Sequence, residues 1–384
     1  MPSENDGLAA WSRRFDDWLF DQALPLWWEK GADHVQGGFI DTLNLDASPA
    51  ETQRRGRVQG RQSWVYGVAG EMGWTGPWRK AAVQGLDFLA AHHLRPDGQF
   101  STKASPAGVV LDATAFLYDQ TFILLAFSQL HKVMPQDADW SGKALALLKA
   151  IAGARTHPQG GFVESGDAPF QSNPHMHLFE AALAWCEAGG GSTWHKLADD
   201  LAELCLSRMI DPASGAIAEY YDAAWKPLPP GGLQHLEPGH QFEWAWLLGR
   251  WSGMRGHMGA HQAAKRLFEA GTRGVDPLRQ VAIFEMSLDF QVTQPAARLW
   301  AQAERIKAAI LLMETADGSE RARYRDAAIA AAGALWRYLE TPTAGLWRDR
   351  MTLEGNFIGE PAPASSFYHI ICAISVLGQG CGNG

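Results

Sequence analysis

The sequence predicts an all-α protein of six helix pairs that close into a ring, with short β-hairpin pieces in the connecting loops. Apolar residues recur with the period of an α-helix over about twelve segments. Short glycine-led segments separate alternate helices, and the first three, Gly37–Ile40, Asp97–Phe100 and Gly160–Val163, recur at about sixty residues. A unit of two helices and a turn cannot bury its apolar face alone, so it must stack on copies of itself.

The helices are expected to alternate between an inner and an outer layer. They span about residues 7–29, 59–74, 77–93, 111–133, 139–154, 173–188, 192–209, 238–252, 257–273, 295–314, 319–339 and 364–378. An open superhelix of helix pairs is the alternative, but such arrays have shorter periods and lack the glycine-led piece. No segment has the length and composition of a linker between domains, so residues 1–384 are expected to form a single domain.

Composition excludes several classes of function. The net charge of −9, with 33 Lys and Arg spread along the chain, leaves no basic stripe for a phosphate backbone, so nucleic acid is not an expected partner. The N-terminus lacks an apolar signal region and the longest apolar runs, such as Phe122–Phe127, are far short of a membrane span. We expect a cytoplasmic protein. The four cysteines lie far apart and indicate neither disulfides nor a thiolate metal site.

Polar residues gather at the predicted starts of alternate helices, where their side chains are expected to point into one cavity. They are Arg57 and Arg61 at one start, His177 and Glu180 at the next, His240 and Glu243 at a third, and Tyr368 and His369 at the last.

The stretch Leu236–Arg250 has the strongest signals of chemistry. Pro238 suits the first turn of a helix, and Gly239 leaves room for another group to approach the backbone. His240 and Glu243 stand three residues apart and share one helix face. The positive end of the helix is expected to keep His240 neutral, while Glu243 acts in the opposite sense and can orient the ring. A packed histidine beside a solvated glutamate is the alternative.

Several segments, in this order and at these intervals, resemble the N-acylglucosamine 2-epimerase superfamily, and within it the bacterial D-mannose isomerase branch. The resemblance spans nearly the whole chain. The segments are Gln59-Gly60-Arg61, Asn173-x-x-x-His177-x-x-Glu180, Pro238-Gly239-His240-x-x-Glu243-Trp244, Trp300-Ala301-Gln302-Ala303-Glu304 and Tyr368-His369.

This resemblance implies an (α/α)6 barrel, with residues 1–384 as one catalytic domain, that moves a proton next to a sugar carbonyl without metal or cofactor. It implies that His240 and His369 are the acid–base pair and that Glu243 orients His240. The remaining candidates are implied substrate contacts: Arg61 and His177 at the carbonyl end, Asn173 and Glu180 on the same wall, and Trp300 and Glu304 in a cavity segment.

The chemistry also follows from the residue types. Removing the weakly acidic C2 proton of an open-chain aldose requires a neutral base, together with donors that stabilise the enediolate oxygens. Return of the proton to C1 converts mannose to fructose, whereas return to C2 from the opposite face gives the 2-epimer. The prediction is therefore a D-mannose–D-fructose isomerase, with a sugar 2-epimerase (N-acylglucosamine, cellobiose or glucose–mannose type) as the alternative.

Three other classes of function are less well supported by the sequence. A glycoside hydrolase on the same barrel needs two carboxylates across the scissile bond, yet each acid here comes beside a histidine. A metal-dependent isomerase needs converging ligands, and His175 and His177 project from different helix faces. A scaffold protein would not need polar residues at helix starts. The expected partner is a monosaccharide, no membrane contact is expected, and a homodimer is left open.

Overall fold

The structure is a computed structural model that describes residues 6–50, 53–229 and 234–382. It is mostly helical, and the chain divides into two compact units. Unit 1 comprises Met1–Ala23, Cys205–Ala362 and His369–Gly384, and unit 2 comprises Leu24–Leu204 and Pro363–Tyr368. The expectation of a single domain over residues 1–384 stays a prediction.

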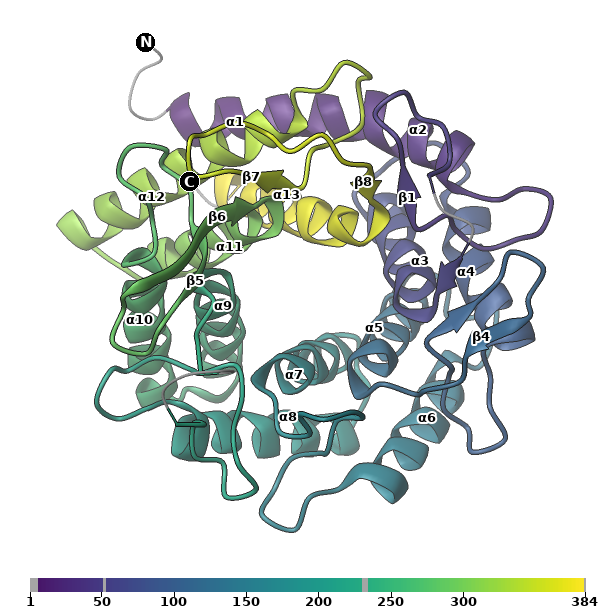
Figure 1. Cartoon of the computed structure of the whole chain (residues 1–384), viewed down its shortest axis with the longest axis horizontal. Helices are drawn as coiled ribbons and strands as arrows, with labels where there is room; N and C mark the ends of the chain where they lie inside the picture. The colour runs from purple at the N-terminus through teal and green to yellow at the C-terminus, as the bar shows by residue number, and fades with distance from the viewer. Residues whose placement is uncertain (1–5, 51–52, 230–233, 383–384) are drawn as a thin grey trace. The chain divides into compact units, whose positions relative to one another are not determined.

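Unit 2 is built of helix pairs and one small sheet (Figure 1). Its helices are α2 (Leu24–Leu26), α3 (Gly56–Glu71), α4 (Trp78–His92), α5 (Leu117–Val133), α6 (Trp140–Arg155), α7 (Ser172–Glu187) and α8 (Ser192–Leu204), with a π-helical turn at Trp27–Gly31. Its strands are β1 (Thr42–Leu43), β2 (Arg54–Arg55), β3 (Lys103–Ala104) and β4 (Val110–Asp112), of which β2, β3 and β4 form an antiparallel sheet.

Unit 1 repeats this organisation. Its helices are α1 (Asp6–Trp18), α9 (Pro238–Arg255), α10 (Met258–Thr272), α11 (Leu299–Glu314) and α12 (Gly318–Leu339), with π-helical turns at Leu19–Ala23 and Cys205–Met209. Strands β5 (Ile283–Met286), β6 (Val292–Arg298) and β7 (Arg350–Met351) form its antiparallel sheet. The boundary between the units falls within β8 (Ala362–Pro363) and again near the start of α13 (Phe367–Gly382), which follows a 3-10 turn at Ala364–Ser366.

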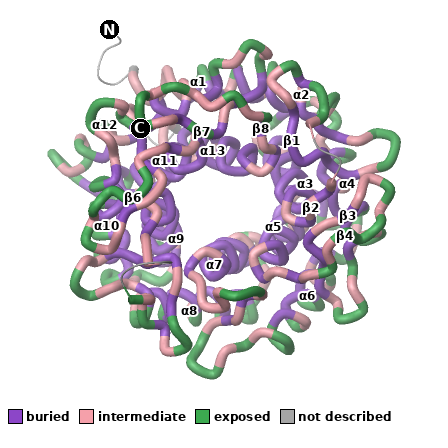
Figure 2. The backbone as a smooth tube through the Cα atoms, viewed as in Figure 1, coloured by how far each residue is buried: buried purple, intermediate pink, exposed green. Residues whose placement is uncertain are grey.

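Alternate helices are the most buried parts of each unit (Figure 2). In unit 2, α5 packs between α3 and α7, and α4, α6 and α8 each cover one of these three. In unit 1, α9 packs against α11, and α10 and α12 cover them. Glycine permits the close approach of α3 to α5, because a Cβ atom at Gly60 would lie 2.9 Å from the backbone carbonyl of Phe122.

A repeated hydrogen-bonding clamp ties four of the turns to the buried helices that follow them. One glutamine near the helix start accepts a hydrogen bond from the backbone N–H of a turn residue and donates one to the same residue's carbonyl oxygen, at 2.7 to 3.0 Å. The pairs are Gln59 with Phe39, Gln120 with Phe100, Gln241 with Ile217 and Gln302 with Ala282. In a fifth turn, His175 Nε2 accepts a hydrogen bond from the backbone N–H of Phe162 at 2.8 Å.

Replacing Gln302 by Leu should lower the free energy of unfolding by about 2 to 4 kcal/mol, because it leaves the buried N–H and carbonyl of Ala282 without partners. Denaturant unfolding would measure this loss. Gln379→Leu is the control, since exposed Gln379 bonds only Ser375 in its own helix at 3.4 Å, and it should change stability by less than about 0.5 kcal/mol. Equal losses in the two variants would contradict the clamp's role.

The observed helices confirm the predicted all-α class, with three local corrections. The helix predicted from residue 111 begins at Leu117, because Val110–Asp112 form β4 on the edge of a sheet. The helix predicted from residue 295 begins at Leu299, because β6 continues to Arg298. A further turn, closed by the pairing of Val275 with Ala282, was missed since Gln280, with φ of 58°, replaces the expected glycine.

Within the described residues, one stretch is long and apolar enough to cross a membrane by length and composition. It is Ala364–Cys381, with a mean hydropathy of 1.2, and 61% of it is buried inside the protein. A buried core helix passes the same test, so this stretch is only weak support for a membrane span.

Candidate active site

The start of α9 positions His240 against an indole ring. Pro238 occupies the first turn of the helix, as predicted. Gly239 leaves room for the ring of Trp300, since a Cβ atom there would lie 2.4 Å from that ring. The His240 and Trp300 rings are consequently in contact, with centroids 4.8 Å apart.

His240 is surrounded by carboxylates. Its Nδ1 lies 2.9 Å from a carboxylate oxygen of Glu219 and 3.9 Å from one of Glu237. Burial acts to lower the pKa of the ring, but the negative charges of Glu219 and Glu237 outweigh burial and raise the pKa to about 10. The prediction of a neutral His240 is therefore wrong, because adjacent full charges outweigh the partial charge of a helix end.

The two glutamates beside His240 are held in different ways. The clamp between Gln241 and Ile217 fixes the turn that carries Glu219, and Glu219 also accepts a hydrogen bond from the backbone N–H of Glu237 at 3.3 Å. Burial raises the pKa of Glu237 to about 7, against the lowering effect of the nearby imidazolium.

His369, on α13, has a different electrostatic environment. Its Nδ1 lies 2.7 Å from Oε1 of Glu304, and Oε2 of the same carboxylate lies 2.7 Å from the ammonium of Lys307. Lys307 is fully buried and lies over the ring of Trp246, 3.9 Å from its centroid. The carboxylate beside His369 thus already has a cation on its other oxygen.

Both histidines contact the same aromatic ring. The Trp300 centroid lies 5.7 Å from that of His369, in addition to its contact with His240. His240 and His369 are each 6% exposed, and Trp300 is 7% exposed. The three rings form one buried cluster.

Two sets of side chains in unit 1 have the donor types of a divalent cation site. They are Glu219 with Glu237 and His240, and Glu243 with Glu304 and His369, the donor atoms of each set lying within 4.8 Å of one another. In each set a protein cation already faces one of the carboxylates: the His240 imidazolium faces Glu219 in the first set, and the Lys307 ammonium faces Glu304 in the second.

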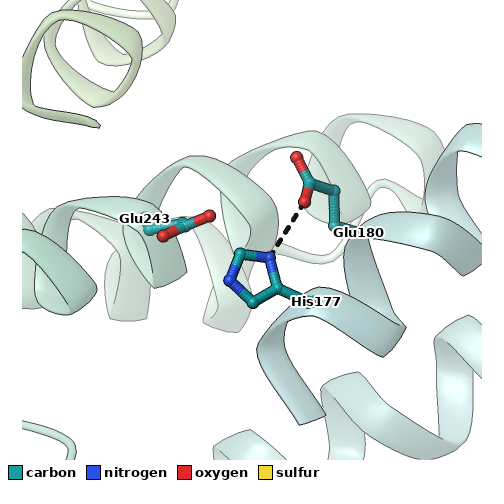
Figure 3. Close-up of side chains that lie close together, drawn as sticks. All are labelled: His177, Glu180 and Glu243. Carbon is teal, nitrogen blue, oxygen red and sulfur yellow. Dashed lines mark hydrogen bonds and ion pairs between the residues drawn. The ribbon is translucent and has the colours of Figure 1, made fainter. Parts of the chain in front are cut away.

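Unit 2 contains a second cluster of buried polar residues. On α7, Nδ1 of His177 lies 3.2 Å from the carboxylate of Glu180, one turn further along the helix (Figure 3). The hydroxyl of Tyr368 donates a short hydrogen bond to the same carboxylate oxygen. Because it bonds both, Glu180 orients the histidine and the tyrosine together.

Arg61 is held by aromatic rings and oxygen acceptors in the same unit. Its guanidinium lies 3.9 Å from the centroid of the Phe122 ring. It donates hydrogen bonds to the hydroxyl of Tyr118 at 2.9 Å and to the carbonyl of Ser365 at 3.1 Å. At the start of α7, Oδ1 of Asn173 is buried and accepts no hydrogen bond from the described residues. A substrate hydroxyl could supply that donor.

A family model described as N-acylglucosamine 2-epimerase (GlcNAc 2-epimerase) matches residues 37–373. The chain belongs to the N-acylglucosamine 2-epimerase family.

Relatives and solved structures resemble the chain over most of its length. It is 45% identical to a mannose-6-phosphate isomerase of Rhizobium meliloti (strain 1021), covering 94% of this chain and 95% of that protein. It is 25% identical to a D-mannose isomerase of Marinomonas mediterranea, covering 81% and 83%. The crystal structure of a D-mannose isomerase matches 99% of both chains with a TM-score of 0.86 at 20% identity. The fold of this family member is accordingly an (α/α)6 barrel, and the protein is an enzyme of the isomerase and epimerase type.

The structure shows which groups lie beside some of the predicted site residues of this epimerase-family enzyme. Glu304, expected to contact substrate, is the hydrogen-bonding partner of His369. Glu243, expected to orient His240, adds its negative charge to that ring's surroundings but also lies beside Glu304 and His369. The closest carboxylate to His240 Nδ1 is that of Glu219.

Glu219 and Lys307 were not predicted as site residues. A signal for Glu219 exists in the sequence, because an acid stands four residues after the first glycine in four of the turns. The segments are Gly37–Asp41, Gly160–Glu164, Gly215–Glu219 and Gly345–Asp349. All four acids are buried, so the pattern marks a structural position in the turn. Of these four acids, Glu219 is the one that contacts His240. No comparable signal marks Lys307, which resembles any helix-surface lysine in sequence.

Proposed function

We propose that the protein interconverts D-mannose and D-fructose through a cis-enediol(ate), with His240 and His369 as the acid–base pair. The observation that carries the proposal is the pairing of each imidazole with a carboxylate through Nδ1, at 2.9 and 2.7 Å, while both rings contact Trp300. Because Nδ1 of each ring faces a carboxylate, Nε2 is the nitrogen that can exchange a proton with a substrate.

The two histidines are suited to opposite roles. His369 is the base, because Lys307 offsets the charge of its partner Glu304 and so favours the neutral ring. It takes the C2 proton of the open-chain aldose and returns it to C1. His240 is the acid, because the carboxylates around it keep it protonated. As an imidazolium it stabilises the negative charge that develops on the enediolate oxygens and relays the proton between them.

The substrate is proposed to be an unphosphorylated sugar. Buried carboxylates predominate around the two histidines, namely Glu219, Glu243 and Glu304, with Lys307 as the nearby lysine. This charge would repel a phosphate dianion. The name of the Rhizobium meliloti relative makes mannose 6-phosphate the second candidate. Arg57 does not favour it, since Asp119 already pairs with that guanidinium at 3.2 Å.

A sugar 2-epimerase remains the alternative within the family, since an imidazolium at His240 could return the proton to C2. A glycoside hydrolase is the more distant alternative.

The substrate-binding roles of Arg61, Asn173, His177 and Glu180 stay predictions, as do those of Trp300 and Glu304. We further propose a cytoplasmic location and a monosaccharide as the partner, without nucleic acid or membrane; a homodimer is left open.

NMR in deuterated water tests the proposal. The protein is incubated separately with D-mannose, D-mannose 6-phosphate, D-glucose and N-acetylglucosamine, and the products and the sites of deuterium are followed. Fructose labelled at C1, formed from unphosphorylated mannose, is the expected result. Labelling at C2 with epimer as the early product would assign the protein to the epimerases. Turnover of only the phosphorylated sugar would overturn the argument from charge.

Prolonged dialysis against a strong chelator should leave the rate of mannose turnover unchanged, because the charges in the site are provided by His240 and Lys307. The rate is measured before dialysis, after it, and after adding back Mg²⁺, Mn²⁺ or Zn²⁺. A loss of activity that an added divalent metal restores would contradict the proposed acid–base mechanism.

A further inference from the structure

Lys307 is a buried charged residue whose role is not explained by packing. It has no exposed surface, and its ammonium lies between the carboxylate of Glu304, at 2.7 Å, and the ring of Trp246, at 3.9 Å from the centroid. Removing an ammonium from water is costly, and an apolar side chain of similar volume often replaces a buried ion pair without loss of stability. A fully buried lysine beside a proposed catalytic histidine therefore points to a role in the reaction.

The geometry links Lys307 to His369 through one carboxylate. Oε2 of Glu304 faces the ammonium and Oε1 faces Nδ1 of His369, each at 2.7 Å. Glu304 and Lys307 stand one turn apart on α11, so the helix fixes both ends of the contact. Trp246, on α9, covers the ammonium with its π face, where a cation is favoured over a neutral group.

We infer that Lys307 is a positioning residue that acts on His369 through Glu304. It holds the carboxylate in place and offsets its negative charge, so that His369 can lose its proton near neutral pH and serve as the base. This inference rests on the proposed function for its catalytic meaning, but the charge relationship it describes can be tested without any substrate.

Other charged groups around His369 do not replace this effect. Glu243, on α9, lies with Glu304 and His369 and favours the protonated ring. His240, also on α9, is a cation but contacts His369 only through the ring of Trp300. Helix α13 itself carries no Asp, Glu, Lys or Arg among Phe367–Gly382. Lys307 is therefore the cation placed to offset the carboxylate that His369 contacts directly.

The test is a pH titration of His369 by NMR in histidine-labelled full-length protein. The His369 signal is assigned, among the 13 histidines, by its loss in His369→Asn. Lys307→Met should raise the pKa of His369 by about one unit, because it removes the positive charge that offsets the Glu304 carboxylate beside the histidine. Lys307→Gln is a second neutral variant that keeps a hydrogen-bond donor, in case the Met variant does not fold. Lys307→Arg keeps the charge and should leave the titration near that of the parent.

Arg305→Met is the matched control. Arg305 is a buried cation on the same helix, but it bonds the carbonyl of Gln280, and burial alone lowers its pKa to about 10. Removing it should not move the His369 titration. An unchanged His369 titration in the folded neutral Lys307 variants, or an equal shift in Arg305→Met, would overturn the inference.

Activity gives the second readout. In Lys307→Met, the acid limb of kcat/KM should move to higher pH together with the His369 titration, whereas a purely structural lysine would lower stability without moving it. A shifted His369 titration in a protein that turns over no sugar would overturn the proposed function and leave the inference standing. Sugar turnover with an unshifted His369 titration would overturn the inference about Lys307 and leave the proposed function standing.

Discussion

We expect His369→Asn to lower kcat for mannose turnover by about a thousandfold, because it removes the proposed base while preserving a polar side chain of similar shape. His369 is 6% exposed and its Nδ1 is held by Glu304, so the substitution removes a base that is already fixed in position. His240→Asn should have an effect of similar size, since the acid is needed in the same proton transfer. Initial rates at saturating mannose would measure both.

His257→Asn is the control for loss of a histidine. His257 caps α10 by accepting a hydrogen bond from the backbone N–H of Ala260 at 3.0 Å, and asparagine is also a good cap. Its activity and its circular dichroism spectrum should match those of the parent. Full activity in either folded His240 or His369 variant would rule out the two-histidine mechanism.

Glu219→Gln should move the alkaline limb of kcat/KM to lower pH and reduce activity at pH 8 by about tenfold. Burial opposes the charged form of His240, and Glu219 is the first of the carboxylates that keep its pKa near 10. Without that charge, the acid loses its proton at a lower pH. A pH–rate profile of the parent and the variant would show the shift.

Glu320→Gln is the matched control for this prediction. It removes a carboxylate on α12 that pairs with Lys265 at 2.8 Å and is not among the charges that act on His240. The alkaline limb of the control's kcat/KM profile should lie at the same pH as that of the parent. If the alkaline limb of Glu219→Gln also lies at the parent's pH, Glu219 does not hold the proton on His240.

Glu219→Gln should also change the stability of the fold in a pH-dependent way. The pKa of His240 is raised from 6.5 to about 10 in the folded protein, so the protonated ring stabilises the fold fully below pH 6.5, and this stabilisation is lost as the pH rises toward 10. The destabilisation of Glu219→Gln relative to the parent should therefore be largest below pH 6.5 and should shrink above it. Denaturant unfolding at several pH values would measure the trend.

Much of the fold could be predicted from local sequence, because helices and their starts depend on neighbouring residues. The apolar period located most helices to within a few residues, and Pro238 marked the start of α9. The turn at Val275–Ala282 was missed because its left-handed residue is Gln280 and not glycine. Local sequence does not show when tertiary contacts support a strained residue.

The sequence by itself determined the helical class and the family, and it selected the two histidines that we propose as the acid–base pair, since all of these depend on periodicity and on motifs within single segments. Tertiary structure alone decided the charge environment of each histidine. Glu219 reaches His240 from a turn 21 residues earlier, and Glu304 with Lys307 reaches His369 from another helix. Coulomb interactions depend on distance in space and on burial, and neither can be read from spacing along the chain.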